Sequence, residues 1–176
     1  MKLTNWIVVT GPPSSGKTTL IQGLQAKGLT ICPESARDII QYSLGSGFVA
    51  KCLRHDKLKL QREILSVSLK REHRLDCALQ IFFDRGMPDS IAYFKLNGFD
   101  PQPAIRASMF RRYQHVVYCE GLPIERDGLR QESELEAKTI GEFLLDAYRM
   151  LGYHPICLPV LPPEQRLEVL LQSLVK

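Results

Sequence analysis

The segment GPPSSGKTTL, at residues 11–20, is the feature that most constrains what this chain of 176 residues can fold into. Its first eight residues fit the pattern GxxxxGK[ST], the phosphate-binding P-loop. Gly11 and Gly16 lack a Cβ, so the backbone there can adopt positive φ and turn its N–H groups inward around an anion. Lys17 adds a positive charge for the β- and γ-phosphates, and the Thr18 hydroxyl can bind Mg²⁺. The segment therefore predicts a site for a nucleoside triphosphate, which we take to be ATP, with Mg²⁺.

The residues on either side of the P-loop support this interpretation. Residues 6–10 (WIVVT) read as a short buried strand, and residues 19–27 read as a helix that ends at Gly28. An ordinary glycine turn would not need a strand before it and a helix after it. In a P-loop, the N-terminus of that helix adds its dipole to the anion site. We expect Lys17 to be exposed in the empty site. The expected nucleotide-binding residues are Gly11, Pro12, Pro13, Ser14, Ser15, Gly16, Lys17, Thr18 and Thr19.

Apolar strands alternate with amphipathic helices along the chain. The expected strands are residues 6–10, 29–32, 79–84, 115–119 and 153–158. The expected helices are residues 19–27, 33–44, 55–77, 89–96, 103–113, 132–151 and 163–175. This alternation predicts one three-layer α/β domain over residues 1–176, with helices on both faces of a five-stranded parallel sheet. By analogy with other P-loop domains, we expect the strand order 2-3-1-4-5.

The composition indicates a cytoplasmic chain without a membrane partner. No apolar run approaches the roughly 20 residues of a membrane span, and the N-terminal MKLTNW leads directly into the first strand without room for a signal peptide. The five cysteines are widely spaced and include no CxxC pair, which indicates reduced thiols.

Three charged residues follow expected strands and should meet the P-loop at one edge of the sheet, because ligands gather at the carboxyl ends of parallel strands. Asp84 ends the third strand, as the acidic residue of a Walker B element does, and is expected to face the metal held by Thr18. Arg85 would point at phosphate or substrate, with a surface ion pair as the alternative. Glu34 follows the second strand and can take a proton from an attacking hydroxyl, or it could only favour the dipole of the helix that it opens.

The polar segment GLPIERDGLRQES, at residues 121–133, holds Arg126 and Arg130 four positions apart. Arginines on a closing loop can stabilise the charge that develops on the γ-phosphate during transfer. We therefore interpret residues 121–132 as a lid, with a solvated loop as the alternative.

A basic segment accounts for much of the positive charge, which totals 23 Lys and Arg against 19 Asp and Glu. One interpretation of this segment, residues 51–74, is a nucleic-acid-binding face. The other is an amphipathic helix with its charges in water. Its core-facing residues would then be Leu58, Ile64, Leu65, Leu69 and Leu75. Few aromatic residues interleave with the basic ones for base stacking, so the sequence argues against nucleic acid as a partner.

Four segments in order, GPPSSGKTTL, PESARDII, FFDRGMPDSIAYF and ERDGLRQES, resemble the small P-loop ATPase/kinase proteins of the AAA-domain group that are related to nicotinamide riboside kinases. The resemblance covers nearly the whole chain and extends more loosely to nucleoside and nucleotide kinases. It implies Lys17 and Thr18 for phosphate and Mg²⁺, Glu34 as the base, Asp84 and Arg85 as an Asp-Arg pair, and Arg126 and Arg130 as lid arginines. It also places Asp89 and Tyr93 near the acceptor pocket. We find no additional AAA-type helical domain, so a ring-forming motor is not implied.

The function expected from these observations is ATP-dependent phosphoryl transfer to a hydroxyl of a small molecule, with a nucleoside-like acceptor as one option. The expected catalytic residues are Lys17, Glu34, Asp84, Arg85, Arg126 and Arg130, and the expected metal ligands are Thr18 and Asp84. Hydrolysis of the nucleotide by a regulatory ATPase and the processing of polynucleotides stay open as alternatives. A monomer and a homodimer are both compatible with the sequence, which names no particular acceptor.

Overall fold

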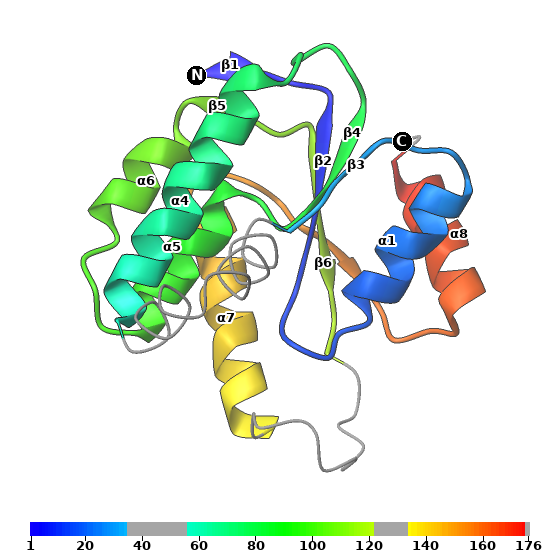
Figure 1. Ribbon diagram of the computed structural model, residues 1–176. Coiled ribbons are helices and arrows are strands. Elements are labelled where there is room, and N and C mark those ends of the chain that lie inside the picture. Colours follow the sequence, from blue (N-terminus) through cyan, green and yellow to red (C-terminus); the bar gives the residue numbers. More distant parts are fainter. Residues whose placement is uncertain (35–55, 122–133, 175–176) are drawn as a thin grey trace, which may run out of the picture.

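The computed structural model describes residues 1–34, 56–121 and 134–174, which form an α/β fold with a twisted sheet between two groups of helices (Figure 1). The larger sheet consists of β2 (Trp6–Thr10), β3 (Ile31–Cys32), β4 (Ile81–Asp84), β6 (His115–Cys119) and β7 (Ile156–Leu158). All its strands are parallel. The short strands β1 (Lys2–Leu3) and β5 (Arg111–Arg112) form a second, two-stranded parallel sheet.

The order of strands across the larger sheet is β3-β4-β2-β6-β7. These labels differ from the expected 2-3-1-4-5 because the sequence reading missed β1 and β5, which are too short to leave a periodic signal. When the five strands of the larger sheet are numbered among themselves along the chain, their order is 2-3-1-4-5.

Helices cover both faces of the larger sheet (Figure 1). One face carries α1 (Lys17–Ala26) and α8 (Pro163–Ser173), which pack against each other. The other face carries α4 (Lys57–Arg74), α5 (Met87–Leu96), α6 (Gln102–Ser108) and α7 (Glu134–Met150). Residues 35–44 of the expected helix over residues 33–44 lie outside the described residues.

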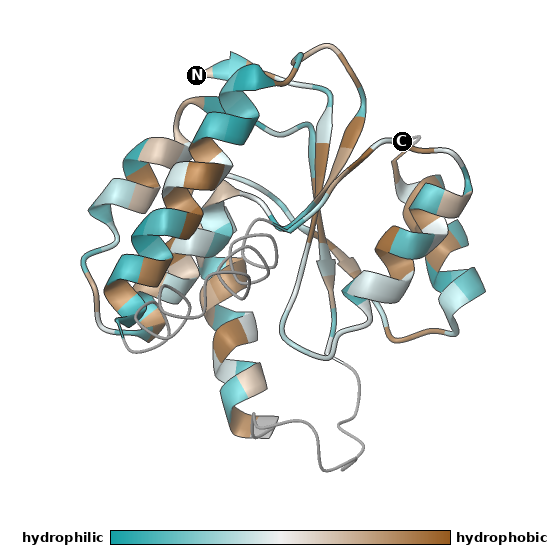
Figure 2. Cartoon of the chain, viewed as in Figure 1, coloured by the Kyte–Doolittle hydropathy of each residue, from teal (hydrophilic) through white to brown (hydrophobic). Residues whose placement is uncertain are grey.

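The central strand β2 shows why this sequence needs helices on two sides. All five of its residues are buried, as in a strand that has no solvent face. Because side chains alternate along a strand, Trp6 and Val8 enter one apolar core while Ile7 and Val9 enter the other. Figure 2 shows the hydrophobic residues concentrated along the strands and on the inward sides of the helices.

The expected helix over residues 103–113 is wrong at its C-terminal end. The helix α6 ends at Ser108, and the chain then forms β5, where Arg111 and Arg112 pair with Lys2 and Leu3. Backbone hydrogen bonds from Lys2 to Phe110 and from Thr4 to Arg112 hold this register. A pairing partner more than 100 residues away cannot be read from local periodicity, so the sequence could not indicate it.

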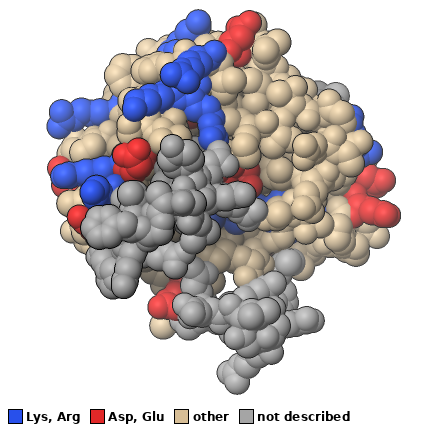
Figure 3. Space-filling view, viewed as in Figure 1, with Lys and Arg blue, Asp and Glu red and all other residues tan. Residues whose placement is uncertain are grey.

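The basic segment is an amphipathic helix over the part that the structure describes. α4 begins at Lys57 and is capped by Asp56, whose side chain accepts a hydrogen bond of 2.9 Å from the Lys59 backbone. Leu65 is buried, and Leu58 and Leu69 pack against the same core. Figure 3 shows Lys and Arg side chains, with a few acidic ones, on the surface where α4 lies. No helix in the described ranges is long and apolar enough to cross a membrane.

Candidate active site

The P-loop between β2 and α1 has the backbone shape that its glycines predicted. Gly11 has φ 146° and Gly16 has φ 75°, and Ser14 adds a positive φ of 58° that the sequence reading did not anticipate. A Cβ at Gly11 would lie 2.4 Å from the carbonyl oxygen of Cys119, so only glycine fits where β2 and β6 end side by side.

Lys17 lies inside the loop, and the expectation that it would be exposed is wrong. Its Nζ donates hydrogen bonds to the carbonyl oxygens of Gly11 at 2.8 Å and Pro12 at 2.6 Å, and to Ser15 Oγ at 3.0 Å. These three acceptors hold the ammonium within the concave loop, and Lys17 is only 8% exposed. Burial, together with the positive charge of Arg85, lowers the pKa of Lys17 to about 8.

Arg166, on α8, is a residue of this site that the sequence reading missed. Its Nη1 donates to the carbonyl oxygen of Ser15 at 2.6 Å, and its Nη2 donates to the carbonyl oxygens of Glu120 and Leu158 at 3.1 Å. Arg166 is 3% exposed. It therefore fastens the P-loop to the ends of β6 and β7. The sequence did hold one signal for the burial of Arg166. It lies four residues before Leu170, and so on the apolar side of an amphipathic helix.

Glu34, Asp84 and Arg85 lie together at the carboxyl edge of the sheet, as their positions after the strands predicted. Arg85 Nε donates to Glu34 Oε1 at 2.7 Å, so the expected base is held by an ion pair. Arg85 has φ 71°, and its backbone N–H donates to the carbonyl oxygen of Val9 at 3.0 Å. This strained conformation turns the residue after β4 toward the P-loop strand.

The charge state of Arg85 follows from its neighbours. Burial alone would lower its pKa, but the groups of Tyr93, Asp89, Glu34 and Asp84 together raise the pKa above its ordinary value. The guanidinium carbon also lies 5.5 Å from the centre of the Tyr93 ring. Arg85 is therefore a permanent positive charge at this edge.

Asp89, which the family resemblance placed near the acceptor pocket, joins three elements by hydrogen bonds. Its Oδ1 accepts from Thr10 Oγ1 at 2.8 Å and from Arg85 Nη1 at 3.2 Å. Its Oδ2 accepts from the Gly86 backbone at 3.1 Å and from the Tyr148 hydroxyl. Burial and the neighbouring Asp89 keep the pKa of Tyr148 well above its ordinary value, so the hydroxyl stays a donor. Asp89 thus holds β2, α5 and α7 in position around the site.

A cavity of about 420 Å³ adjoins this edge. Its lining includes Glu34, Asp84, Arg85, Asp89 and Tyr93, and thus brings the predicted chemistry and the expected acceptor residues to one space. The helix α4 contributes Leu60, Gln61, Ile64, Ser68, Arg71 and Glu72. The sequence reading did not place this part of the basic segment at the acceptor pocket. Residues 35–50 lie outside the described part of the chain.

Two further predictions concern the lid and the metal ion. Arg126 and Arg130, and the expected lid apart from Gly121, lie outside the described residues. Within the described ranges, no three His, Cys, Asp or Glu side chains cluster as a metal site. A Mg²⁺ ion held with a nucleotide needs fewer protein ligands, because phosphate oxygens and water complete its octahedron. The Thr18 hydroxyl at the start of α1 and the Asp84 carboxylate at the end of β4 carry oxygen atoms of the kind that this ion binds.

Comparisons with known proteins agree with this geometry. A family model described as an AAA domain matches residues 6–166. The deoxyadenosine kinase from M. mycoides with dCMP and dCDP aligns with a TM-score of 0.64 and 18% identity, over 97% of this chain and 98% of that chain. NadR protein in complex with NAD and AMP-PNP aligns with a TM-score of 0.68 and 14% identity, over 98% of this chain and 50% of NadR. NadR protein in complex with NR aligns with a TM-score of 0.67 and 14% identity, over 97% of this chain and 50% of NadR. No curated protein sequence matches the chain.

Proposed function

The chain belongs to the AAA-domain family and has a P-loop kinase-like fold, and from this premise we propose that it transfers the γ-phosphoryl group of ATP to a hydroxyl of a small, nucleoside-like molecule. One observation carries the proposal. The cavity of about 420 Å³ opens on Glu34, Asp84 and Arg85, so an organic acceptor can lie against the same edge as the nucleotide phosphates.

The roles proposed for the residues follow from their positions. Lys17 exchanges its contacts with the P-loop carbonyls for contacts with phosphate oxygens, and the loop N–H groups surround the same anion. Thr18 and Asp84 would hold Mg²⁺, which would supply positive charge beside the phosphate oxygens during transfer. The partly buried guanidinium of Arg85 stabilises negative charge at the transferred group.

Glu34 is proposed as the base that takes the proton of the acceptor hydroxyl. The acceptor oxygen forms a bond to the γ-phosphorus while the bond between this phosphorus and the ADP oxygen breaks. The pairing of Glu34 with Arg85 orients the carboxylate, which lies on the cavity wall. Arg126 and Arg130 are proposed to add positive charge to the transferred group and to exclude water, as lid arginines do.

The experiment that tests this function is a measurement of ADP release with and without a set of nucleosides and nucleoside-like vitamins. We expect slow turnover with ATP and Mg²⁺ alone and faster turnover with at least one acceptor. The substitution Glu34→Gln should reduce transfer by about 10²- to 10⁴-fold with ATP affinity retained, whereas Asp84→Asn should impair all nucleotide chemistry. Fast turnover by the wild type without an acceptor would instead show a regulatory ATPase.

A further inference from the structure

We propose that Glu72 selects the acceptor, by accepting a hydrogen bond from an amino or amide N–H group on the base-like part of the molecule that occupies the cavity. This inference rests on the proposed function and names a property of the acceptor that the phosphate-binding motifs do not reveal. The acceptor class is a nucleoside whose base carries an exocyclic amino or amide N–H group.

Glu72 is a buried charged residue on the wall of the cavity. It lies near the C-terminal end of α4, is 5% exposed, and lines the same cavity as Glu34 and Arg85. Leu60 and Ile64 from the same helix, Phe83 from β4 and Met87 from α5 line the cavity with it. A buried carboxylate costs free energy unless its oxygens have hydrogen-bond partners, so an oxygen without one is a place for a polar group of a ligand.

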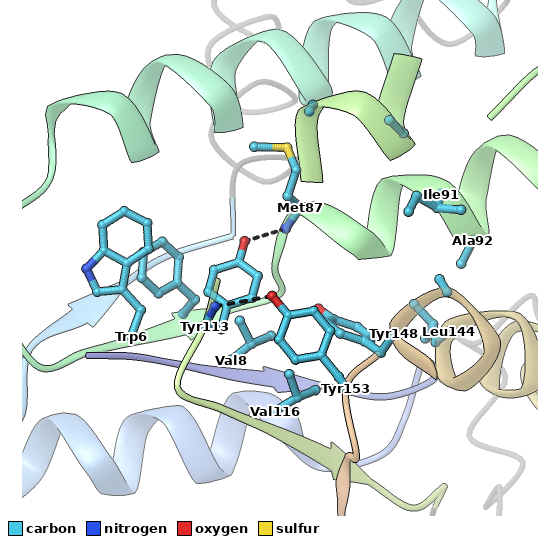
Figure 4. Close-up of a cluster of buried hydrophobic side chains, with 14 of the residues drawn as sticks. Trp6, Val8, Met87, Ile91, Ala92, Tyr113, Val116, Leu144, Tyr148 and Tyr153 are labelled. Carbon is cyan, nitrogen blue, oxygen red and sulfur yellow. Dashed lines mark hydrogen bonds between the residues drawn. The ribbon is translucent and has the colours of Figure 1, made fainter. Parts of the chain in front are cut away.

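The Tyr113 hydroxyl holds the Glu72 carboxyl group in position. The Met87 backbone N–H donates to the Tyr113 hydroxyl at 2.9 Å, as Figure 4 shows. This hydroxyl therefore uses its own proton to donate to Glu72 Oε1. Tyr113 is itself positioned by its backbone N–H, which donates to the Tyr153 hydroxyl at 3.2 Å (Figure 4).

The second oxygen is the one left to bind a ligand. Among the described residues, Tyr113 is the partner found for the Glu72 side chain, through Oε1 alone. Glu72 is more than nine-tenths buried and lines the cavity, so its Oε2 is available to a molecule in the cavity. An acceptor N–H group is the complement of a carboxylate oxygen in this position.

The surroundings make one such contact selective. A site with a buried hydrogen-bonding group rejects an analogue that lacks the matching group, because the buried group is then left unpaired. Burial raises the pKa of Glu72 to about 7, against the opposing effects of the Tyr113 hydrogen bond and of Arg111. At pH 8 the carboxyl group is therefore mainly ionised and can only accept hydrogen bonds.

The test uses pairs of nucleosides that differ in one group of the base. Adenosine and cytidine carry an amino group where inosine and uridine carry a carbonyl oxygen, and nicotinamide riboside carries an amide where nicotinic acid riboside carries a carboxylate. ATP-dependent phosphorylation of each is measured at pH 8 as kcat/KM. For at least one pair, we expect the wild type to prefer the member with the exocyclic amino or amide N–H group by about 10- to 100-fold, the range of a hydrogen bond to a charged group.

The substitution Glu72→Gln should reduce this preference to within about threefold, because an amide can present either a donor or an acceptor. It keeps the oxygen that Tyr113 needs and so preserves the fold. Glu63→Gln is the matched control, because Glu63 lies on the exposed face of the same helix and should leave the preference unchanged.

Three results would overturn the inference. A preference that persists in Glu72→Gln, or a wild type that prefers the carbonyl members, would remove the role of Glu72 and leave the kinase function intact. If the wild type binds ATP but phosphorylates none of the six nucleosides, the proposed nucleoside kinase function fails, and the selection role fails with it.

Discussion

The two ends of the active site are built in different ways. At the phosphate end, two of the described charged groups are each held by several partners: Lys17 by three loop acceptors, and Asp89 by four donors. At the acceptor end, α4 places both apolar and polar residues on the cavity wall, and Glu72 is held through one oxygen. A dense network suits a phosphate group that is always the same, whereas a carboxyl group held through one oxygen suits recognition of one particular molecule.

The largest effect should come from Lys17→Ala, at the phosphate end. The substitution removes the cation that contacts phosphate, and we expect ATP affinity to fall by at least about 100-fold, since hydrogen bonds to charged groups contribute about 1.5–3 kcal/mol each. Calorimetric titration with ATP and Mg²⁺ measures this loss. Lys27→Ala, at the exposed end of α1, is the control and should bind ATP normally. Equal affinity in wild type and Lys17→Ala would refute the P-loop assignment.

Arg166→Ala tests whether the phosphate end depends on a distant helix. The substitution leaves the carbonyl oxygens of Ser15, Glu120 and Leu158 without this donor, so the free energy of unfolding should fall by about 3–4 kcal/mol. Because Ser15 belongs to the P-loop, KM for ATP should also rise more than KM for the acceptor. Urea unfolding and steady-state kinetics measure the two effects, with the exposed Arg149→Ala as control. Equal changes in both KM values would show a general loss of structure.

The acceptor end should give a pH dependence of stability. Burial raises the pKa of Glu72 from its ordinary 4.5 to about 7, and the facing groups are Tyr113, Arg111 and Tyr153. Between these pH values the folded chain binds more protons than the unfolded chain, so stability falls as pH rises, by at most about 3 kcal/mol. Urea unfolding at pH 5 and pH 8 measures the fall. Glu72→Gln should remove it, and Glu63→Gln should keep it. An equal fall in Glu72→Gln would assign the effect to other groups.

The smallest effect should come from Tyr148→Phe, which removes one donor from a network with several. Asp89 keeps its contacts with Thr10, Arg85 and Gly86, so we expect a loss of only about 1 kcal/mol of stability. Thermal unfolding measures this change. A loss several times larger would mean that the four donors to Asp89 act cooperatively and that the phosphate end is less redundant than it looks.

Sequence reasoning brought three charged residues to one edge of the sheet, but it did not find the part of α4 that lines the cavity. Glu34, Asp84 and Arg85 could be assigned to one edge because each lies at or just after the end of an apolar strand, and parallel strands end on the same side. The part of α4 that lines the cavity could not be assigned from the sequence. An amphipathic pattern shows which residues face inward, but it does not show whether they face the sheet or a ligand. In the sequence, Glu72 is one of several charged residues in the basic segment. Only its contact with Tyr113 distinguishes it from the others.

The sequence by itself determined the P-loop, the alternation of strands and helices, and the edge of the sheet where the chemistry lies. These properties depend on neighbours within a few residues, such as glycine φ angles and apolar runs. Only the tertiary structure decided that Lys17 is held inside its loop, that Arg166 reaches Ser15 from a helix 151 positions away, and that Glu72 faces the cavity. Contacts of this kind depend on how distant elements pack, and no local pattern records which distant partner a side chain will meet.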